Sequence, residues 1–306
     1  MKKIKRRFYR WTSLFGFLLF IIGNFACNRQ TAVVKSKLGY NLTNPDLQLS
    51  LPDTLREISG ITLIDSTTIA CIQDENGILF FYDINRNEIK RQVTFYENGD
   101  YEAICLVDTT IFVLRSDGAL FGISNYKEKK INVSIYLTDM QHANNEGLCY
   151  DSEHEQLLIG RKNKIAKGKE FKNKRAIYAF DLKTKSLKQY PVLEFDVDSV
   201  KKLAFEQKIL IPFKHKKKDN SKESPIRFAI SEIAIHPFTK KLFLLSSIDH
   251  LLFIINDKGM IEHIEKLDPL LFPQPEGMAF LENGDMLITN EGRNKSSTLL
   301  KFKYSD

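Results

Sequence analysis

Cysteine is scarce in this sequence of 306 residues, which contains only four. Cys27 lies near the N-terminus, and Cys71, Cys105 and Cys149 each lie inside an apolar run. An odd number of cysteines in such runs argues against a disulfide framework as the basis of the fold. We expect these three residues to serve as small, buried hydrophobic side chains.

Long apolar segments and helical periodicity are also missing. The apolar run Leu14–Ile22 is too short to cross the hydrocarbon core of a bilayer, which takes about twenty residues. Beyond it, no stretch has a long apolar period of 3.6 residues, so few helices are expected. The sequence also lacks a nucleophile elbow, zinc-ligand spacing and a phosphate-binding loop, so no catalytic triad is predicted and the chain is interpreted as a binding protein rather than an enzyme.

The basic charge says little about partners. The formal charge is +7, but six basic residues and no acidic ones lie within the first 26 residues, which leaves +1 for the rest. The aromatic residues that would interleave with basic ones in a nucleic-acid groove are absent, so no nucleic acid is expected as a partner. Two lysine-rich stretches, Lys162–Arg175 and Lys214–Lys222, are interpreted as solvated loops, with a phosphate- or lipid-binding patch as the alternative.

The N-terminus has the features of a bacterial lipoprotein signal. A basic start is followed by the short apolar run, and Asn24-Phe25-Ala26-Cys27 is similar to a lipobox. We predict a signal peptide over residues 1–26, a lipidated Cys27 with a tether over 27–45, and one domain over 46–306. The predicted location is the cell envelope, anchored in the outer membrane on its periplasmic face. The alternatives are ordinary cleavage near an incidental Cys27, and a single uncleaved anchor.

A short phrase recurs at a nearly constant spacing. Its copies start at residues 59, 102, 146, 231 and 276, so the intervals are 43, 44, 85 and 45 residues. The long interval equals two periods, which predicts a sixth copy without its signature near residue 188. The copies read as follows: Ser59-Gly60-Ile61, Glu102-Ala103-Ile104, Glu146-Gly147-Leu148, Ser231-Glu232-Ile233 and Glu276-Gly277-Met278.

Each repeat consists of short apolar runs separated by turns rich in Asp, Asn and Gly. Consecutive antiparallel strands with this period are typical of propeller blades. We therefore predict an all-β fold, a six-bladed β-propeller, in which Leu47–Pro52 completes the last blade as its outer strand and closes the ring. Three residues after each phrase begins, the side chain is small, which we attribute to crowding at the propeller axis.

The phrase residues begin the predicted innermost strands, and a polar group follows each about fifteen residues later. Both sets should line one mouth of the channel. The predicted ligand-binding residues are Glu57, Asp74, Glu75, Glu102, Arg115, Glu146, Arg161, Glu276 and Glu291. Glu102, Glu146 and Glu276 are the candidate ligands of a Ca²⁺ ion, a cation that prefers several oxygen ligands. The alternatives are a polar ligand held by the two arginines, and carboxylates that only bind turn amides.

The order and spacing of these motifs resemble the SdiA-regulated family of envelope β-propellers. The resemblance covers roughly residues 45–306, although the fourth repeat departs from it with a lysine-rich insertion. It implies a six-bladed fold and an envelope location. The matching stretches are Glu57-Ile58-Ser59-Gly60-Ile61, Asp74-Glu75-Asn76-Gly77-Ile78, Asp100-Tyr101-Glu102-Ala103-Ile104, Asn145-Glu146-Gly147-Leu148, Ser231-Glu232-Ile233-Ala234-Ile235-His236-Pro237 and Gln274-Pro275-Glu276-Gly277-Met278.

Three functions are consistent with these observations. The first is a monomeric, lipid-anchored propeller that binds a ligand, a cation or an envelope partner at its channel mouth. The second is a calcium-dependent hydrolase of lactones, esters or phosphoesters, by analogy with other propellers alone. The third is a scaffold that holds another envelope protein on its rim.

Overall fold

The computed structural model describes residues 38–140, 144–210, 214–215, 222–223, 225–293 and 295–305. The chain divides into the units Met1–Lys35 and Ser36–Asp306, and every described residue belongs to the second. The predicted signal peptide and the predicted lipidation site Cys27 therefore lie outside the described residues. Within the described parts, no helix is both long and apolar enough to cross a membrane.

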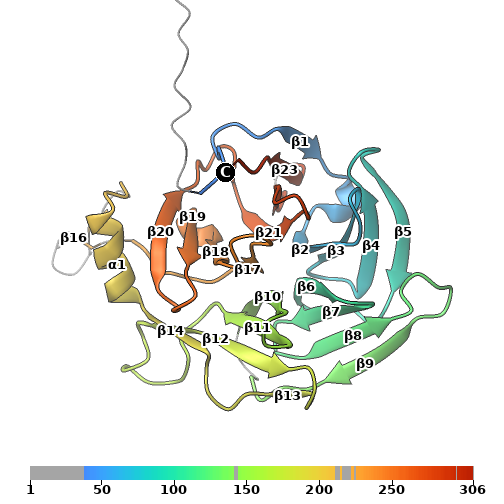
Figure 1. Cartoon of the computed structure of the whole chain (residues 1–306), viewed down its shortest axis with the longest axis horizontal. Helices are drawn as coiled ribbons and strands as arrows, with labels where there is room; N and C mark the ends of the chain where they lie inside the picture. Colours follow the sequence, from blue (N-terminus) through green and yellow to red (C-terminus); the bar gives the residue numbers. More distant parts are fainter. Residues whose placement is uncertain are drawn as a thin grey trace, which may run out of the picture. The chain divides into compact units, whose positions relative to one another are not determined.

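The second unit is built from five antiparallel sheets of four or five strands, arranged around a common centre (Figure 1). The first sheet contains β2 (Ile58–Leu63), β3 (Thr68–Gln73), β4 (Ile78–Asp83) and β5 (Glu88–Thr94). The second contains β6 (Tyr101–Val107), β7 (Thr110–Arg115), β8 (Leu120–Ser124) and β9 (Asn132–Tyr136). The third contains β10 (Asn145–Asp151), β11 (Gln156–Arg161), β12 (Lys174–Asp181), β13 (Ser186–Leu187) and β14 (Leu193–Asp196). The fourth contains β17 (Glu232–Ile235), β18 (Leu242–Ser246), β19 (Leu251–Ile255) and β20 (Ile261–Lys266). The fifth contains β21 (Pro275–Phe280), β22 (Met286–Asn290), β23 (Thr298–Phe302) and β1 (Leu47–Ser50).

The first strand of each sheet lies at the centre and contacts the first strands of its two neighbours. Strands β2, β6, β10, β17 and β21 contact one another in this order, and β21 returns to β2. The fold is therefore a β-propeller, as predicted from the repeats. The predicted number of blades is wrong, because the described residues form five blades rather than six.

The long interval between the third and fourth phrases contains the third blade and, in place of the predicted sixth blade, an insertion. After the outer part of the third blade come the helix α1 (Val197–Glu206) and the small hairpin of β15 (Lys214–His215) and β16 (Lys222–Glu223). The Asp196 side chain caps α1 by accepting hydrogen bonds from the backbone of Asp198 and Ser199. An insertion of one period in length and a degenerate repeat produce the same spacing, so the sequence period did not separate them.

The fifth blade joins both ends of the described chain. Strand β1 pairs antiparallel with β23, with Leu49 opposite Leu299, and so forms the outer strand beside the three C-terminal strands. Two 3-10 turns, Asp53–Leu55 and Ser247–Asp249, complete the regular elements. Part of the predicted tether belongs to the core, since Leu38, Tyr40 and Leu42 are buried against the fourth and fifth blades.

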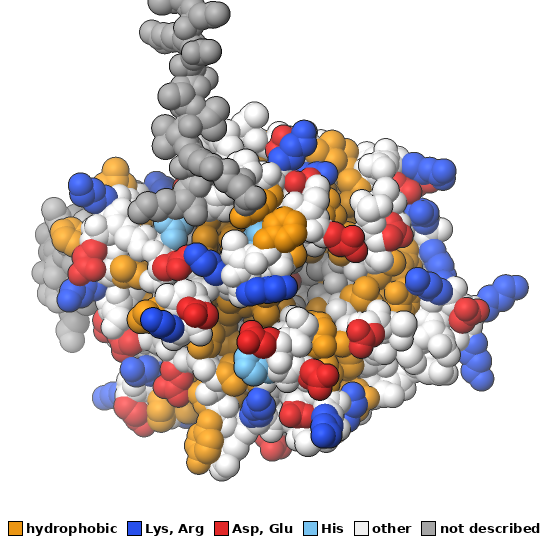
Figure 2. All heavy atoms as spheres, viewed as in Figure 1, with side chains coloured by type: hydrophobic (Ala, Val, Ile, Leu, Met, Phe, Trp, Pro, Cys, Tyr) orange, Lys and Arg blue, Asp and Glu red, His pale blue; other side chains and the backbone are white. Residues whose placement is uncertain are grey.

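Aspartates fix several of the turns between strands. Asp83, at the end of β4, accepts hydrogen bonds from the backbone amides of Asn85 and Arg86, and Asp181 does the same after β12. These are Asx turns, in which the side chain replaces a backbone acceptor. The three described cysteines are free and buried, as the sequence analysis expected. On the face that Figure 2 shows, Lys and Arg side chains are interspersed with Asp and Glu.

Candidate functional site

The first residue of the recurring phrase is the extra residue of a β-bulge. In β2, β6, β10 and β21, the pairing with the next strand shifts register around the second residue of the strand, which is the first residue of the phrase. These residues are Ser59, Glu102, Glu146 and Glu276. A bulge redirects the side chain of its extra residue and is frequent beside functional sites. The bulge therefore directs one polar side chain toward the same end of the channel in each of these four blades.

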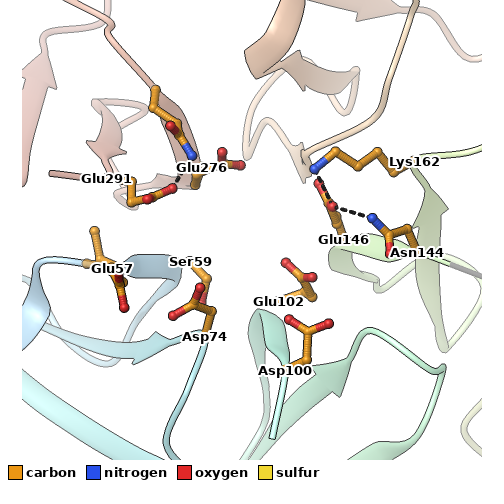
Figure 3. Close-up of a pocket in the computed structure, with 12 residues that line it drawn as sticks. Glu57, Ser59, Asp74, Asp100, Glu102, Asn144, Glu146, Lys162, Glu276 and Glu291 are labelled. Carbon is orange, nitrogen blue, oxygen red and sulfur yellow. Dashed lines mark hydrogen bonds and ion pairs between the residues drawn. The ribbon is translucent and has the colours of Figure 1, made fainter. Parts of the chain in front are cut away.

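These side chains line an acidic cavity of about 290 Å³ (Figure 3). Seven carboxylates and one lysine line it, and Glu102, Glu146 and Glu276 approach one another across it. The lining residues are Glu57, Ile58, Ser59, Asp74, Asp100, Glu102, Asn144, Glu146, Lys162, Gln274, Glu276 and Glu291.

The residue after each bulge is small because the neighbouring innermost strand passes close to it. A Cβ atom on Gly60 would lie 3.1 Å from the Cα atom of Ala103.

The fourth blade differs, since Glu232 occupies this position and β17 begins without a bulge. The Glu232 carboxylate is 1% exposed, and its Oε1 accepts hydrogen bonds from the backbone amides of Leu148 and Ile233 at 3.1 and 2.8 Å. Burial raises the pKa of Glu232 well above its usual value, and Glu276 and Glu146 add to the rise.

Lys162 is the cation that balances part of this charge. Its Nζ lies 2.5 Å from Oε1 of Glu146, and Asn144 donates a hydrogen bond to the same oxygen at 3.3 Å. The Glu146 side chain is almost completely buried, whereas that of Lys162 is about one third exposed. Burial opposes the charge of Lys162, but Glu146, Glu276 and Glu102 together outweigh it and raise the lysine's pKa.

The remaining carboxylates are not fully neutralised, so they bind protons more readily than free side chains. Burial raises the pKa of Glu276 to about 7 and that of Asp74 to about 6, and neighbouring carboxylates add to the second shift. Burial and the charge of Glu146 raise the pKa of Glu102, and burial raises that of Glu146 despite Lys162. The cavity therefore holds protons that a bound cation would displace.

Six of the nine predicted ligand-binding residues meet in this cavity, and three do not. Glu75 is exposed and is not among the lining residues. The Arg115 guanidinium is paired with Asp117, through contacts of 3.1 and 2.8 Å, and lies over the Phe121 ring. Arg161 donates to the Ile165 carbonyl and lines another cavity. The two arginines proposed to hold a polar ligand therefore do not line this cavity, and Lys162 is the cationic side chain among its lining residues.

Sequence reasoning omitted several lining residues from the site. Lys162 directly follows Arg161 at the end of β11, and successive side chains of an extended chain point to opposite sides. Alternation alone thus indicates that one of the two faces the channel, without saying which. Asp100 and Gln274 each stand two residues before a phrase glutamate and reach the cavity from the preceding loop.

The three candidate calcium ligands do not form a ready coordination sphere. Among the described residues, no group of three or more His, Cys, Asp or Glu side chains is arranged to hold a metal ion. Glu102, Glu146 and Glu276 line one cavity, but a bare Ca²⁺ ion needs six to eight oxygens at short distances.

A second cavity, of about 250 Å³, lies farther along the same innermost strands, and most of the residues that line it are apolar. The small residues that the sequence analysis singled out line it, namely Thr62, Cys105, Cys149, Ala234 and Ala279. The sequence analysis attributed their size to crowding at the axis. In the structure, these short side chains also leave open space between the blades.

The fold and the site together define a five-bladed β-propeller with an acidic cavity at one end of its channel. A scan of protein-family models and a search of curated proteins give no match to the chain. Among solved structures, the fold is similar to that of a luciferin-regenerating enzyme, with a TM-score of 0.51, 10% identity and coverage of 85% of this chain and 95% of that chain.

Two further solved structures resemble the chain more distantly. A streptogramin B lyase matches with a TM-score of 0.47 and 11% identity over 85% of this chain and 97% of that chain. A protein of unknown function from Bacteroides thetaiotaomicron matches with a TM-score of 0.47 and 11% identity over 76% of this chain and 52% of that chain. Identities this low reflect the shared fold and say nothing about a shared activity.

Proposed function

We propose that this propeller is a binding protein that takes a positively charged ligand into the acidic cavity at its channel mouth. The observation that carries the proposal is the imbalance of charge, with seven carboxylates and one lysine around a space of about 290 Å³. A ligand with several ammonium groups, or a hydrated divalent cation such as Ca²⁺, supplies the missing positive charge. The hydrolase alternative rests on analogy between folds, and no described contact favours it.

Binding of a cation should be linked to the release of protons. Asp74 and Glu276 have pKa values of about 6 and about 7, so both are partly protonated near neutral pH. A cation favours their charged forms, and its affinity should therefore rise with pH between about 5 and 8. The calorimetric heat should depend on the ionisation enthalpy of the buffer, since released protons are taken up by it.

We predict that the full chain in detergent binds spermidine or Ca²⁺ and that Glu276→Gln weakens this binding by about tenfold or more, through loss of a charge-assisted contact. Isothermal titration calorimetry at pH 8 measures both. The matched control is Glu75→Gln, which removes the same charge from an exposed position outside the cavity. Equal loss in the two variants, or no saturable binding of either cation, would contradict the proposal.

We further propose that the chain is a lipid-anchored envelope protein, of the type that the SdiA-regulated family represents. The support is the sequence pattern at Cys27 and the order of the repeat motifs, while the five blades depart from the six that the resemblance implies. Bacterial lipoproteins carry more than one acyl chain, which stable anchoring requires.

The anchoring proposal predicts a change in fractionation. Cys27→Ser should move the protein from the membrane fraction to the soluble fraction, because no lipid can then be attached at this position. Cell fractionation followed by immunoblotting measures the distribution. Cys71→Ser is the control, since Cys71 is buried in β3 and should not affect the anchor. If Cys27→Ser stays with the membrane, the lipid anchor is disproved.

A further inference from the structure

A basic cavity lies next to the acidic one. It measures about 530 Å³ and is lined by Arg161, Asn163, Lys164, Ala166, Lys167, Lys172 and Arg175. Five of these seven residues are cationic, and none is acidic. Glu170 is the one acid in the loop between β11 and β12, but it is not among the lining residues, and its carboxylate lies beside Gly168.

Two adjacent residues at the end of β11 separate the cavities. Arg161, the last residue of the strand, lines the basic cavity, whereas Lys162 lines the acidic one. The loop that follows contributes three lysines to the lining, and Arg175, near the start of β12, returns to the same cavity. The two strands thus place both arginines at the base of the loop, and the loop adds the lysines around them.

The cations of this cavity have few partners in the protein. The Arg161 Nη1 donates to the Ile165 carbonyl at 2.8 Å, and Arg175 donates to the carbonyls of Lys172, Lys174 and Arg227. The Nε atoms of both arginines are buried and have no acceptor among the described residues. A buried donor without an acceptor is costly, so the protein leaves the two guanidinium groups incompletely satisfied.

The lysines are similarly free of carboxylates. Among the described residues, no acidic side chain forms an ion pair with Lys164, Lys167 or Lys172, and Lys164 has only a contact of 3.4 Å with the Gly168 carbonyl. Burial lowers the pKa of Arg175, and the charge of Asp249 only partly offsets this. An anion in the cavity would compensate for this unpaired positive charge.

We propose that this basic cavity binds the phosphate group of a phosphorylated ligand. Guanidinium groups hydrogen-bond phosphate oxygens through their planar fork, and lysine ammonium groups add charge without a fixed geometry. Five cations around one cavity are enough to neutralise a phosphate group, which carries up to two negative charges and several acceptor oxygens. The phosphate belongs either to a soluble ester or to the headgroup of a lipid.

The test measures phosphate binding by the full chain in detergent, with inorganic tripolyphosphate as the probe in isothermal titration calorimetry. The combined variant Lys164→Gln, Lys167→Gln and Lys172→Gln removes three exposed lysines of the cavity, so the fold should be retained. We expect it to weaken binding by about tenfold or more. The matched control changes three lysines of the β8–β9 loop, Lys127, Lys129 and Lys130, to glutamine, and we expect less than about twofold.

A second pair of measurements identifies the source of the phosphate. Tighter binding of water-soluble dibutyryl phosphatidic acid than of glycerol phosphate supports the site and indicates a lipid headgroup, and equal binding supports the site and indicates a soluble ester. Arg161→Gln should weaken both, with the melting temperature as a check of folding. No saturable binding of tripolyphosphate, or equal loss in the two triple variants, overturns the proposal. Cation binding at the acidic cavity is measured separately and does not depend on this result.

Discussion

Lys162→Met should lower the free energy of unfolding by about 1–3 kcal/mol at pH 8, because it leaves the buried Glu146 carboxylate without its partner. The Lys162 ammonium lies 2.5 Å from the Glu146 carboxylate, and it is the cationic side chain among those that line the acidic cavity. Without it, Glu146 stays buried beside Glu102 and Glu276 with no counter-charge. At pH 5 the loss should be smaller, because Glu146 can then bind a proton instead.

A double variant tests whether the loss comes from this pair. Adding Glu146→Gln to Lys162→Met removes the uncompensated charge and should restore much of the stability at pH 8. Urea unfolding of the wild type, both single variants and the double variant gives the coupling energy. Lys169→Met is the control, since Lys169 is exposed in the same loop. A double variant as unstable as Lys162→Met alone would show that the ion pair is not the cause.

The stability of the wild type should decrease as the pH rises from about 5 to 8. Carboxylates with a raised pKa bind more protons in the folded state than in the unfolded state. Their contribution is therefore complete below the unfolded pKa and is lost as the pH rises through the folded value. For Glu276, whose pKa rises from 4.5 to about 7, the loss amounts to about 3 kcal/mol. Asp74, whose pKa rises from 3.8 to about 6, adds to this loss of stability as the pH rises toward about 6.

Other carboxylates act in a separate window. Burial opposes the charge of Asp65, Asp151 and Asp285, but backbone and side-chain hydrogen bonds outweigh it and lower the pKa of each below 3.8. The contribution of these residues to the stability of the fold is therefore lost only as the pH falls through the lowered pKa values. Stability should therefore be highest between about pH 4 and 5. A bound cation should reduce the loss above pH 6, because it favours the ionised carboxylates.

Thermal unfolding measured across this pH range tests the prediction. Glu276→Gln removes a titrating group from the cavity, so its stability should depend less on pH between 5 and 8. Glu75→Gln, at an exposed position, should keep the slope of the wild type. A wild-type protein whose stability rises over this range would show that the buried carboxylates do not take up protons as described.

The local elements could be predicted from the sequence because they depend on neighbouring residues. Apolar runs between Asp- and Gly-rich turns predicted the strands, as in Thr68–Gln73 and Ile78–Asp83. The repeated phrase predicted which residues begin the innermost strands, since four of the five blades share the same bulge and a small residue after it. For this reason Glu102, Glu146 and Glu276 were placed correctly at one mouth of the channel.

The number of blades depended on the tertiary structure. The segment between the third and fourth phrases has the length of two repeats, but its described residues form one blade, a helix and a hairpin rather than two blades. Closure depends on whether the five innermost strands fill the circle around the channel, a property of the packing of all blades together. Spacing along the chain contains no information on this packing.

The sequence by itself determined that this protein is a β-propeller with acidic residues at one end of its channel, because strands, turns and bulges are encoded within each repeat. Only the tertiary structure decided how the charges pair. Arg115 turns to its neighbour Asp117, Arg161 faces a basic cavity, and Lys162 enters the acidic cavity to meet Glu146. A one-residue difference reverses the side of the strand on which a side chain lies, so the partner of each charge follows from the final register and packing.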